Sequence, residues 1–135
     1  MGVLQRFVLD SPVEQSNKRR IIYLLLALSC FGLGVLLNYT YRPFVYSNHI
    51  NDWHLADVIG NMVAVPATAF FYYALNKTIR HTRFTVLLVD FIIWCLYEVF
   101  LSHTFDWRDI LASLIMCLAT YPILTALTKT ITKDK

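Results

Sequence analysis

The sequence predicts an all-α integral membrane protein with four transmembrane helices in an antiparallel bundle. Four apolar stretches, each of about 20 residues, match the length of a membrane-spanning helix. Hydrophobic residues make up 57% of the 135 residues and charged residues only 16%, which is more apolar than an ordinary soluble domain. A soluble domain this small could not bury so much apolar surface in one core. Because backbone polar groups in lipid must be satisfied within the chain, these stretches are expected to be helices.

The predicted spans belong to a single domain, residues 18–135, which follows a polar cytoplasmic tail of residues 1–17. The four spans cover residues 21–39, 56–75, 84–101 and 110–127. Only a short turn separates the third span from the fourth, so these two helices are expected to be antiparallel neighbours. In the first span, Ser29, Gly32 and Gly34 form a strip of small residues that favours close contact with another helix.

The distribution of Lys and Arg predicts that both termini are cytoplasmic. The segment before the first span holds four basic residues, the loop after the second span holds three, and the C-terminal tail holds three. The opposite side has only Arg42 and Arg108. Since short loops rich in Lys and Arg remain in the cytoplasm, we expect a multi-pass protein of the cell inner membrane, with Arg42 and Arg108 outside.

Several function classes are not favoured by the sequence. The basic residues do not form one patch with interleaved aromatic residues, so nucleic acid is not an expected partner. Cys30, Cys95 and Cys117 lie within apolar stretches and lack a CxxC spacing, which argues against a disulfide framework and a zinc site. There is no nucleophile motif and no phosphate-binding loop, so the sequence does not favour an enzyme, and no cofactor is expected.

Two stretches of the sequence resemble each other, residues 52–61 and residues 106–113. Both contain Asp-Trp, then an acidic residue, two branched apolar residues, a small residue and a short polar residue. Both also stand at the outer start of a span that runs inward. One interpretation is a pair of repeated helix hairpins with the same topology. Chance, or a shared need to cap the start of a helix, is the other interpretation, and the sequence leaves both open.

Glu98 is the most informative single residue, because it lies about one turn before the outer end of the third span. A carboxylate at membrane depth is costly unless it reaches water, pairs with another group or faces a wet cavity. We therefore expect Glu98 to point into the bundle, near Asp57 and Asn61 of the second span or near Asp109 of the fourth. Arg42 and Arg108 are the candidate partners for the charge.

Polar and charged side chains gather at the outer end of the predicted bundle. The candidate ligand-binding residues there are Glu98, Asp57, Asn61, Asp109, His54, Arg42, Arg108, Asp106 and His103. Such a cluster suits a proton or cation site, or a lipid-headgroup site in which the arginines meet phosphate. An Asp in the first turn of a helix also has a structural role, because it caps free backbone amides. No HxxxH or HxxE spacing is present, so no metal site is predicted.

Asp90, near the inner end of the third span, is expected to pair with Arg83 or Lys77 of the preceding loop.

The third and fourth spans carry a family resemblance. Tyr97-Glu98, followed by residues 105–113, resembles the VanZ-like family of small bacterial membrane proteins, and the match lies mainly in residues 86–127. The resemblance implies that Glu98 and Asp109 form an acidic pair, with Asp57 and Asn61 as a matching pair in the first half. Ser113 stands where the family pattern has Asn, and Val99 follows Glu98 where the family has Gln nearby. The resemblance also implies a bacterial cell-envelope setting.

Three hypotheses of function follow. The first is a VanZ-like inner-membrane protein whose acidic and histidine cluster binds an envelope lipid or its headgroup. The second is a small transporter or channel subunit for a cation or a proton-coupled solute. The third is a non-catalytic assembly subunit of a larger membrane complex. Membrane lipid is the expected partner, and a homo-oligomer or a larger complex is compatible with each hypothesis.

Overall fold

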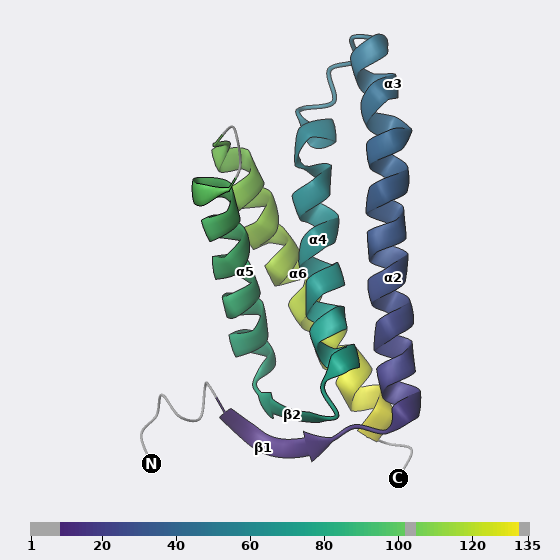
Figure 1. Cartoon of the computed structure of the whole chain (residues 1–135), viewed down its shortest axis with the longest axis vertical. Coiled ribbons are helices and arrows are strands. Elements are labelled where there is room, and N and C mark those ends of the chain that lie inside the picture. The colour runs from purple at the N-terminus through teal and green to yellow at the C-terminus, as the bar shows by residue number, and fades with distance from the viewer. Residues whose placement is uncertain (1–8, 102–104, 133–135) are drawn as a thin grey trace.

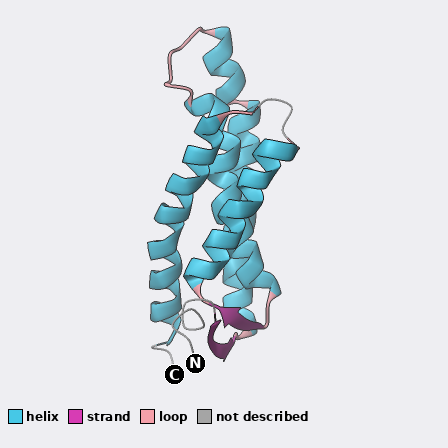
Figure 2. Ribbon diagram, turned by 90° about the vertical axis from the view of Figure 1, so that its left-hand side faces the viewer, coloured by secondary structure: helices cyan, strands magenta, loops and turns pink. Residues whose placement is uncertain are grey.

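In the computed structural model of the chain, residues 9–101 and 105–132 are described. Most of these residues are helical, and four long helices stand side by side along the long axis of the molecule (Figure 1). The elements in chain order are β1 (Leu9–Glu14), α2 (Asn17–Tyr39), α3 (Tyr41–Ser47), α4 (Leu55–Leu75), β2 (Thr78–His81), α5 (Arg83–Phe100) and α6 (Trp107–Thr132). We call the end of the bundle that carries both strands the sheet end, and the opposite end the α3 end (Figure 2).

The long helices agree with the predicted spans to within a few residues at each boundary. Within the described residues, three helices are long and apolar enough to cross a membrane: α2 together with α3, α4, and α6. α5 has 18 residues but includes three charged side chains, Arg83, Asp90 and Glu98. The predicted all-α class is therefore confirmed in its coarse form, as a mostly helical chain with apolar helices of membrane-spanning length.

α4 is the central helix of the bundle, because it packs against α2, α5 and α6. A cluster of buried apolar side chains fills the space between the helices in the half of the bundle nearest the sheet end. Its largest members are Tyr23 of α2, Phe70 and Tyr73 of α4, and Leu124 of α6. Many large apolar side chains face outward instead, as expected for helices whose surroundings are hydrocarbon rather than water.

The polar N-terminal tail predicted from the sequence contains a strand that the sequence pattern did not indicate. β1 pairs with β2 in antiparallel fashion, with Val13 opposite Ile79 and Glu14 opposite Thr78. The strand has Pro12 in its middle and no clear alternation of polar and apolar residues, so it carries little strand signal of its own. Its pairing depends on the α4–α5 connection, which lies about 65 residues further along the chain.

A side chain just before α2 and another near the start of α2 satisfy carbonyl groups at the C-terminal end of α4. The last carbonyls of a helix have no partner within it, and in lipid they have no water either. The buried Gln15 amide donates from Nε2 to the carbonyl oxygens of Tyr73 (3.0 Å) and Asn76 (2.9 Å). Arg20 donates from Nε to the Ala74 carbonyl (2.9 Å) and from Nη2 to that of Leu75 (3.3 Å). Gln15 and the start of α2 therefore hold the C-terminal end of α4 at the sheet end of the bundle.

The strip of small residues in α2 contributes to packing at one position only. Gly34 is buried, and a Cβ atom placed there would clash with the Val63 side chain of α4. Gly32 is exposed, with nothing within 4 Å of such an atom, and Ser29 bonds back to the Leu25 carbonyl of its own helix. Close approach of α2 and α4 therefore requires glycine at position 34.

We expect Gly34→Ala to destabilise the protein by about 1–3 kcal/mol, because the added methyl group forces the stiff Val63 side chain or the helix to move. The matched variant Gly32→Ala should leave stability unchanged or raise it slightly, since alanine favours a helix over glycine. The thermal unfolding of both proteins, followed by circular dichroism in one detergent, measures the difference. Equal unfolding temperatures for the two variants would contradict the proposed contact.

Candidate functional site

Three polar side chains from three different helices meet at the α3 end of the bundle. Asn61 of α4 is 8% exposed and Glu98 of α5 is 5% exposed, and the Asn61 amide donates from Nδ2 to Oε1 of Glu98 at 3.2 Å. The carboxylate of Asp109, in the first turn of α6, interacts electrostatically with both of them. We call Asn61, Glu98 and Asp109 the carboxylate site. The prediction that Glu98 points into the bundle is confirmed.

The helical repeat explains why these side chains meet. Residues four apart lie on the same face of a helix, so Asp90, Trp94 and Glu98 share one face of α5. That face is turned toward α4, since Glu98 reaches Asn61 there and Asp90 reaches Thr68, seven residues further along α4. The two buried carboxylates of α5 therefore contact α4 at two levels of the bundle.

The charge of the carboxylate site has no cationic partner in the described part of the chain. The second oxygen of Glu98, Oε2, is buried and accepts no hydrogen bond. The ion pairs formed among residues 9–101 and 105–132 join His54 to Asp57 and Lys77 to Glu14, and neither involves Glu98 or Asp109. Two carboxylates close together in a region with little water repel each other unless a proton or a cation is present.

Asp57 makes its hydrogen bonds in a neighbouring group of polar side chains, although its charge also acts on Asp109. Its carboxylate accepts a hydrogen bond from the Tyr46 hydroxyl of α3 and contacts Nδ1 of His54 at 3.0 Å. Of the neighbours expected for Glu98, the structure brings Asn61 and Asp109 to it and turns Asp57 toward the loop. Tyr46 is a member of this group that the sequence reasoning missed, because its position depends on how α3 extends beyond α2.

The two arginines expected to neutralise Glu98 do not contact it. Arg42 donates from Nε to the Tyr46 hydroxyl (3.3 Å) and from Nη1 to Asn38 (3.4 Å), and its guanidinium lies over the Tyr46 ring. The guanidinium of Arg108 lies over the ring of Trp107, 5.8 Å from its centre. Exposed cations of this kind gain more from aromatic contact and water than from entering the bundle.

Asp106 and its counterpart Asp52 act as caps at the starts of helices. Oδ1 of Asp106 accepts a hydrogen bond from the backbone N–H of Arg108 (2.9 Å), and Oδ2 of Asp52 accepts one from that of Ala56 (2.7 Å). The two Asp-Trp sequences therefore share a capping role, which is one of the two interpretations of their similarity. His103, the remaining candidate, lies outside the described residues.

The prediction that Asp90 pairs with Arg83 or Lys77 is wrong. Lys77 contacts Glu14 of β1 at 3.0 Å, since the strand that pairs with β2 brings Glu14 beside it. Asp90 is 7% exposed, and its oxygens lie 2.7 and 2.9 Å from the Thr68 hydroxyl of α4. Among the residues whose structure is described, no group of three or more His, Cys, Asp or Glu side chains is arranged to hold a metal ion.

Comparison of the chain with protein-family models, with curated proteins and with solved structures gives no match. The carboxylate site is therefore interpreted from its own geometry.

We expect Glu98→Gln to fold with a stability within about 0.5 kcal/mol of the parent protein, because the amide oxygen still accepts from Asn61 and the buried charge is removed. Glu98→Ala should cost about 1–3 kcal/mol, since it leaves the buried Asn61 amide without its acceptor. Thermal unfolding in lipid nanodiscs measures both. A Glu98→Gln protein as unstable as Glu98→Ala would show that the fold itself requires the charge.

Proposed function

We propose that the chain is a four-span protein of the cell inner membrane with both termini in the cytoplasm. α5 supports this proposal as the additional span, because Asp90 and Glu98 are buried against α4 while Val89, Ile93 and Leu96 face outward. The sheet end, with its Lys and Arg residues, is then cytoplasmic. The α3 end is outside, where the exposed rings of Tyr39 and Trp53 suit the membrane interface.

Single cysteines at Asn48 and Thr78 test this orientation in a background without Cys30, Cys95 and Cys117. Both positions are exposed, Asn48 after α3 and Thr78 in β2, so a difference in labelling reports the side of the membrane and not burial. A thiol reagent that does not cross membranes should label Asn48→Cys in intact cells and leave Thr78→Cys unlabelled until the cells are opened. The reverse pattern would contradict the proposed orientation.

We propose that the carboxylate site binds a positively charged group, and that its ligand is an envelope lipid with an ammonium headgroup. The observation that carries the proposal is Glu98, whose buried carboxylate has one oxygen bonded to Asn61 and the other without a donor. An ammonium group offers several N–H donors together with the missing positive charge. The arginines contact aromatic rings instead, so the site itself favours a cation over a phosphate.

The depth of the site supports a headgroup as the source of this cation. Glu98 lies in the last turn of α5 and Asp109 in the first turn of α6. Both are therefore within a few ångströms of the level at which α5 ends and α6 begins. The resemblance to the VanZ-like family is consistent with this proposal, because it singles out the same two carboxylates. Under the proposed orientation, this level is the outer headgroup region of the membrane.

The proposal predicts that the protein retains phosphatidylethanolamine in preference to phosphatidylglycerol. Native mass spectrometry of the full chain, released from nanodiscs that contain both lipids equally, measures the retained lipid. Glu98→Gln should lower retention of phosphatidylethanolamine about ten-fold, the loss expected for one charged hydrogen bond. Glu14→Gln, which removes an exposed carboxylate at the sheet end, should leave retention unchanged.

Two further outcomes separate the possible sources of the cation. If free ethanolamine or Na⁺ alone raises the unfolding temperature of the parent protein but not of Glu98→Gln, while neither lipid is retained, the site takes a small free cation. If the parent protein and Glu98→Gln retain both lipids equally and respond equally to the free cations, the site has no cationic ligand, and the proposal fails.

Transport of a cation or proton is a second candidate function, and the position of Asp90 favours it. Asp90 and Glu98 lie eight residues apart on one face of α5, about 12 Å along its axis. Each has a polar partner on α4, Thr68 and Asn61 respectively, so polar groups extend below the α3 end toward the middle of the bundle. Cation or proton flux into liposomes that contain the protein distinguishes transport from binding.

A further inference from the structure

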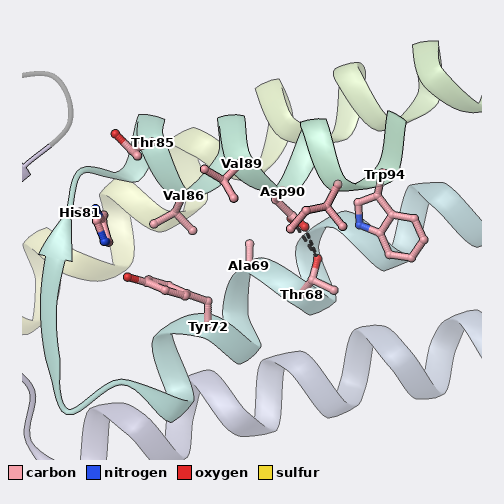
Figure 3. Close-up of a pocket in the computed structure, with 10 residues that line it drawn as sticks. Thr68, Ala69, Tyr72, His81, Thr85, Val86, Val89, Asp90 and Trp94 are labelled. Atoms are coloured by element: carbon pink, nitrogen blue, oxygen red, sulfur yellow. Dashed lines mark hydrogen bonds between the residues drawn. The ribbon is translucent and has the colours of Figure 1, made fainter. Parts of the chain in front are cut away.

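A cavity lies between α4 and α5, in the half of the bundle nearest the sheet end. It has a volume of about 350 Å³ and extends from His81 of β2 to Trp94 of α5 (Figure 3). Ala69, Val86, Val89 and Ile93 make most of its wall apolar, and the ring of Tyr72 also lines it. Val89 and Ile93 are 50% and 55% exposed, so the cavity opens at the side of the bundle as a groove. We call it the α4–α5 groove.

The hydrogen-bond donors described beside Asp90 in the α4–α5 groove are uncharged. The Thr68 hydroxyl lies within 3.1 Å of four acceptor oxygens, namely both oxygens of Asp90 and the carbonyls of Ala64 and Val65. A hydroxyl has a single hydrogen and donates it to one of these acceptors at full strength. An i−4 carbonyl such as that of Ala64 is the usual acceptor for a threonine within a helix. Asp90 therefore shares the single Thr68 proton with two backbone carbonyls, and the Trp94 indole, which also interacts with Asp90, is likewise uncharged.

The charge of Asp90 is also unbalanced within the part of the chain that the structure describes. Lys77, just before β2, forms its ion pair with Glu14 and not with Asp90. His81 lines the groove near its sheet end, whereas Asp90 and Thr68 lie toward the Trp94 end (Figure 3). A buried carboxylate without a cation is costly in an apolar region, and a cation from outside the chain would remove that cost.

We propose that the α4–α5 groove binds a lipophilic cation, an amphiphile whose ammonium group meets Asp90 and whose apolar body lies along Val86, Val89 and Ile93. The ammonium group supplies the positive charge that the described residues of the groove lack, together with several N–H donors. Aromatic rings of Tyr72 and Trp94 also line the groove, and such rings attract cations. Apolar walls with one charged group describe a small-ligand pocket, and the volume lies at the lower end of the usual range.

The chemistry of the groove selects this class of ligand over a neutral lipid chain. A neutral chain would fill the apolar wall but would leave the buried charge of Asp90 without a counterion. A small hydrated cation would meet the carboxylate but would leave the apolar wall unfilled and would lose its water in a region of hydrocarbon. Only an amphiphile with a cationic head satisfies both parts of the groove.

Trp94 allows the proposal to be tested by fluorescence, because the chain contains three tryptophans and only Trp94 lines the groove. In a Trp53→Phe, Trp107→Phe background in lipid nanodiscs, a brominated twelve-carbon primary amine quenches Trp94 on contact. The brominated alcohol of the same length measures quenching that results from partition into lipid alone. The amine should reach half-maximal quenching at a concentration about ten-fold lower than the alcohol, the ratio expected for one charged hydrogen bond.

Three variants determine whether Asp90 causes this difference. Asp90→Asn keeps the shape and a contact with Thr68 but removes the charge, and it should abolish the ten-fold advantage of the amine. Glu98→Gln removes the other buried carboxylate of the same face of α5, and it should retain the advantage. Val89→Phe narrows the mouth of the groove while leaving Asp90 intact, and it should lower the quenching by the amine even if Asp90→Asn fails to fold.

Two results would overturn the proposal. Equal quenching by the amine and the alcohol in the protein with the native groove would show that the groove does not recognise a cation. Loss of the advantage in Glu98→Gln but not in Asp90→Asn would assign the amine to the carboxylate site instead. The inference does not depend on the lipid proposed for that site, so either proposal can fail while the other stands.

Discussion

A carboxylate on a helix surrounded by hydrocarbon needs a polar partner inside the protein, and this constraint sets how α5 packs. Asp90 and Glu98 recur on one face of α5, and α4 presents Thr68 and Asn61 at the matching levels. With that face turned inward, the apolar residues between them face outward, where hydrocarbon is expected. Two hydrogen-bonded contacts with α4 therefore add to the apolar packing of Val86 and Leu87 in fixing which face of α5 is turned inward.

The contacts between the helices differ between the two ends of the bundle. Near the sheet end, aromatic and aliphatic side chains such as Tyr23, Phe70 and Leu124 form the buried cluster, and Gln15 and Arg20 close the end of α4. Near the α3 end the helices meet through polar groups. Each half also contains one buried carboxylate of α5 that no cation of the described residues balances, Asp90 in the half nearest the sheet end and Glu98 at the α3 end.

The sequence was sufficient for the features that depend on one helix at a time. The lengths of the apolar stretches predicted the four long helices to within a few residues at each boundary. The cost of an unpaired carboxylate in lipid predicted that Glu98 points inward. Features that join distant segments were not accessible. β1 has no strand pattern of its own and forms by pairing with β2. This pairing also brings Glu14 beside Lys77, which was one of the two partners expected for Asp90. The Tyr46–Asp57 contact likewise requires the position of α3.

The two buried carboxylates of α5 differ in what they can bind because they lie at different depths. Glu98 is near the end of its helix, and under the proposed topology headgroups and water reach this level, so a hydrated cation or a lipid ammonium group can approach it. Asp90 is about 12 Å further along the helix, in a groove with apolar walls, where a cation arrives only if it carries its own apolar body. In the two proposals, a single chemical need, a donor with positive charge, selects a polar headgroup at one level and a lipophilic cation at the other. The proposed ligand classes differ because the carboxylates lie at different depths, and not because their hydrogen-bond partners on α4 differ.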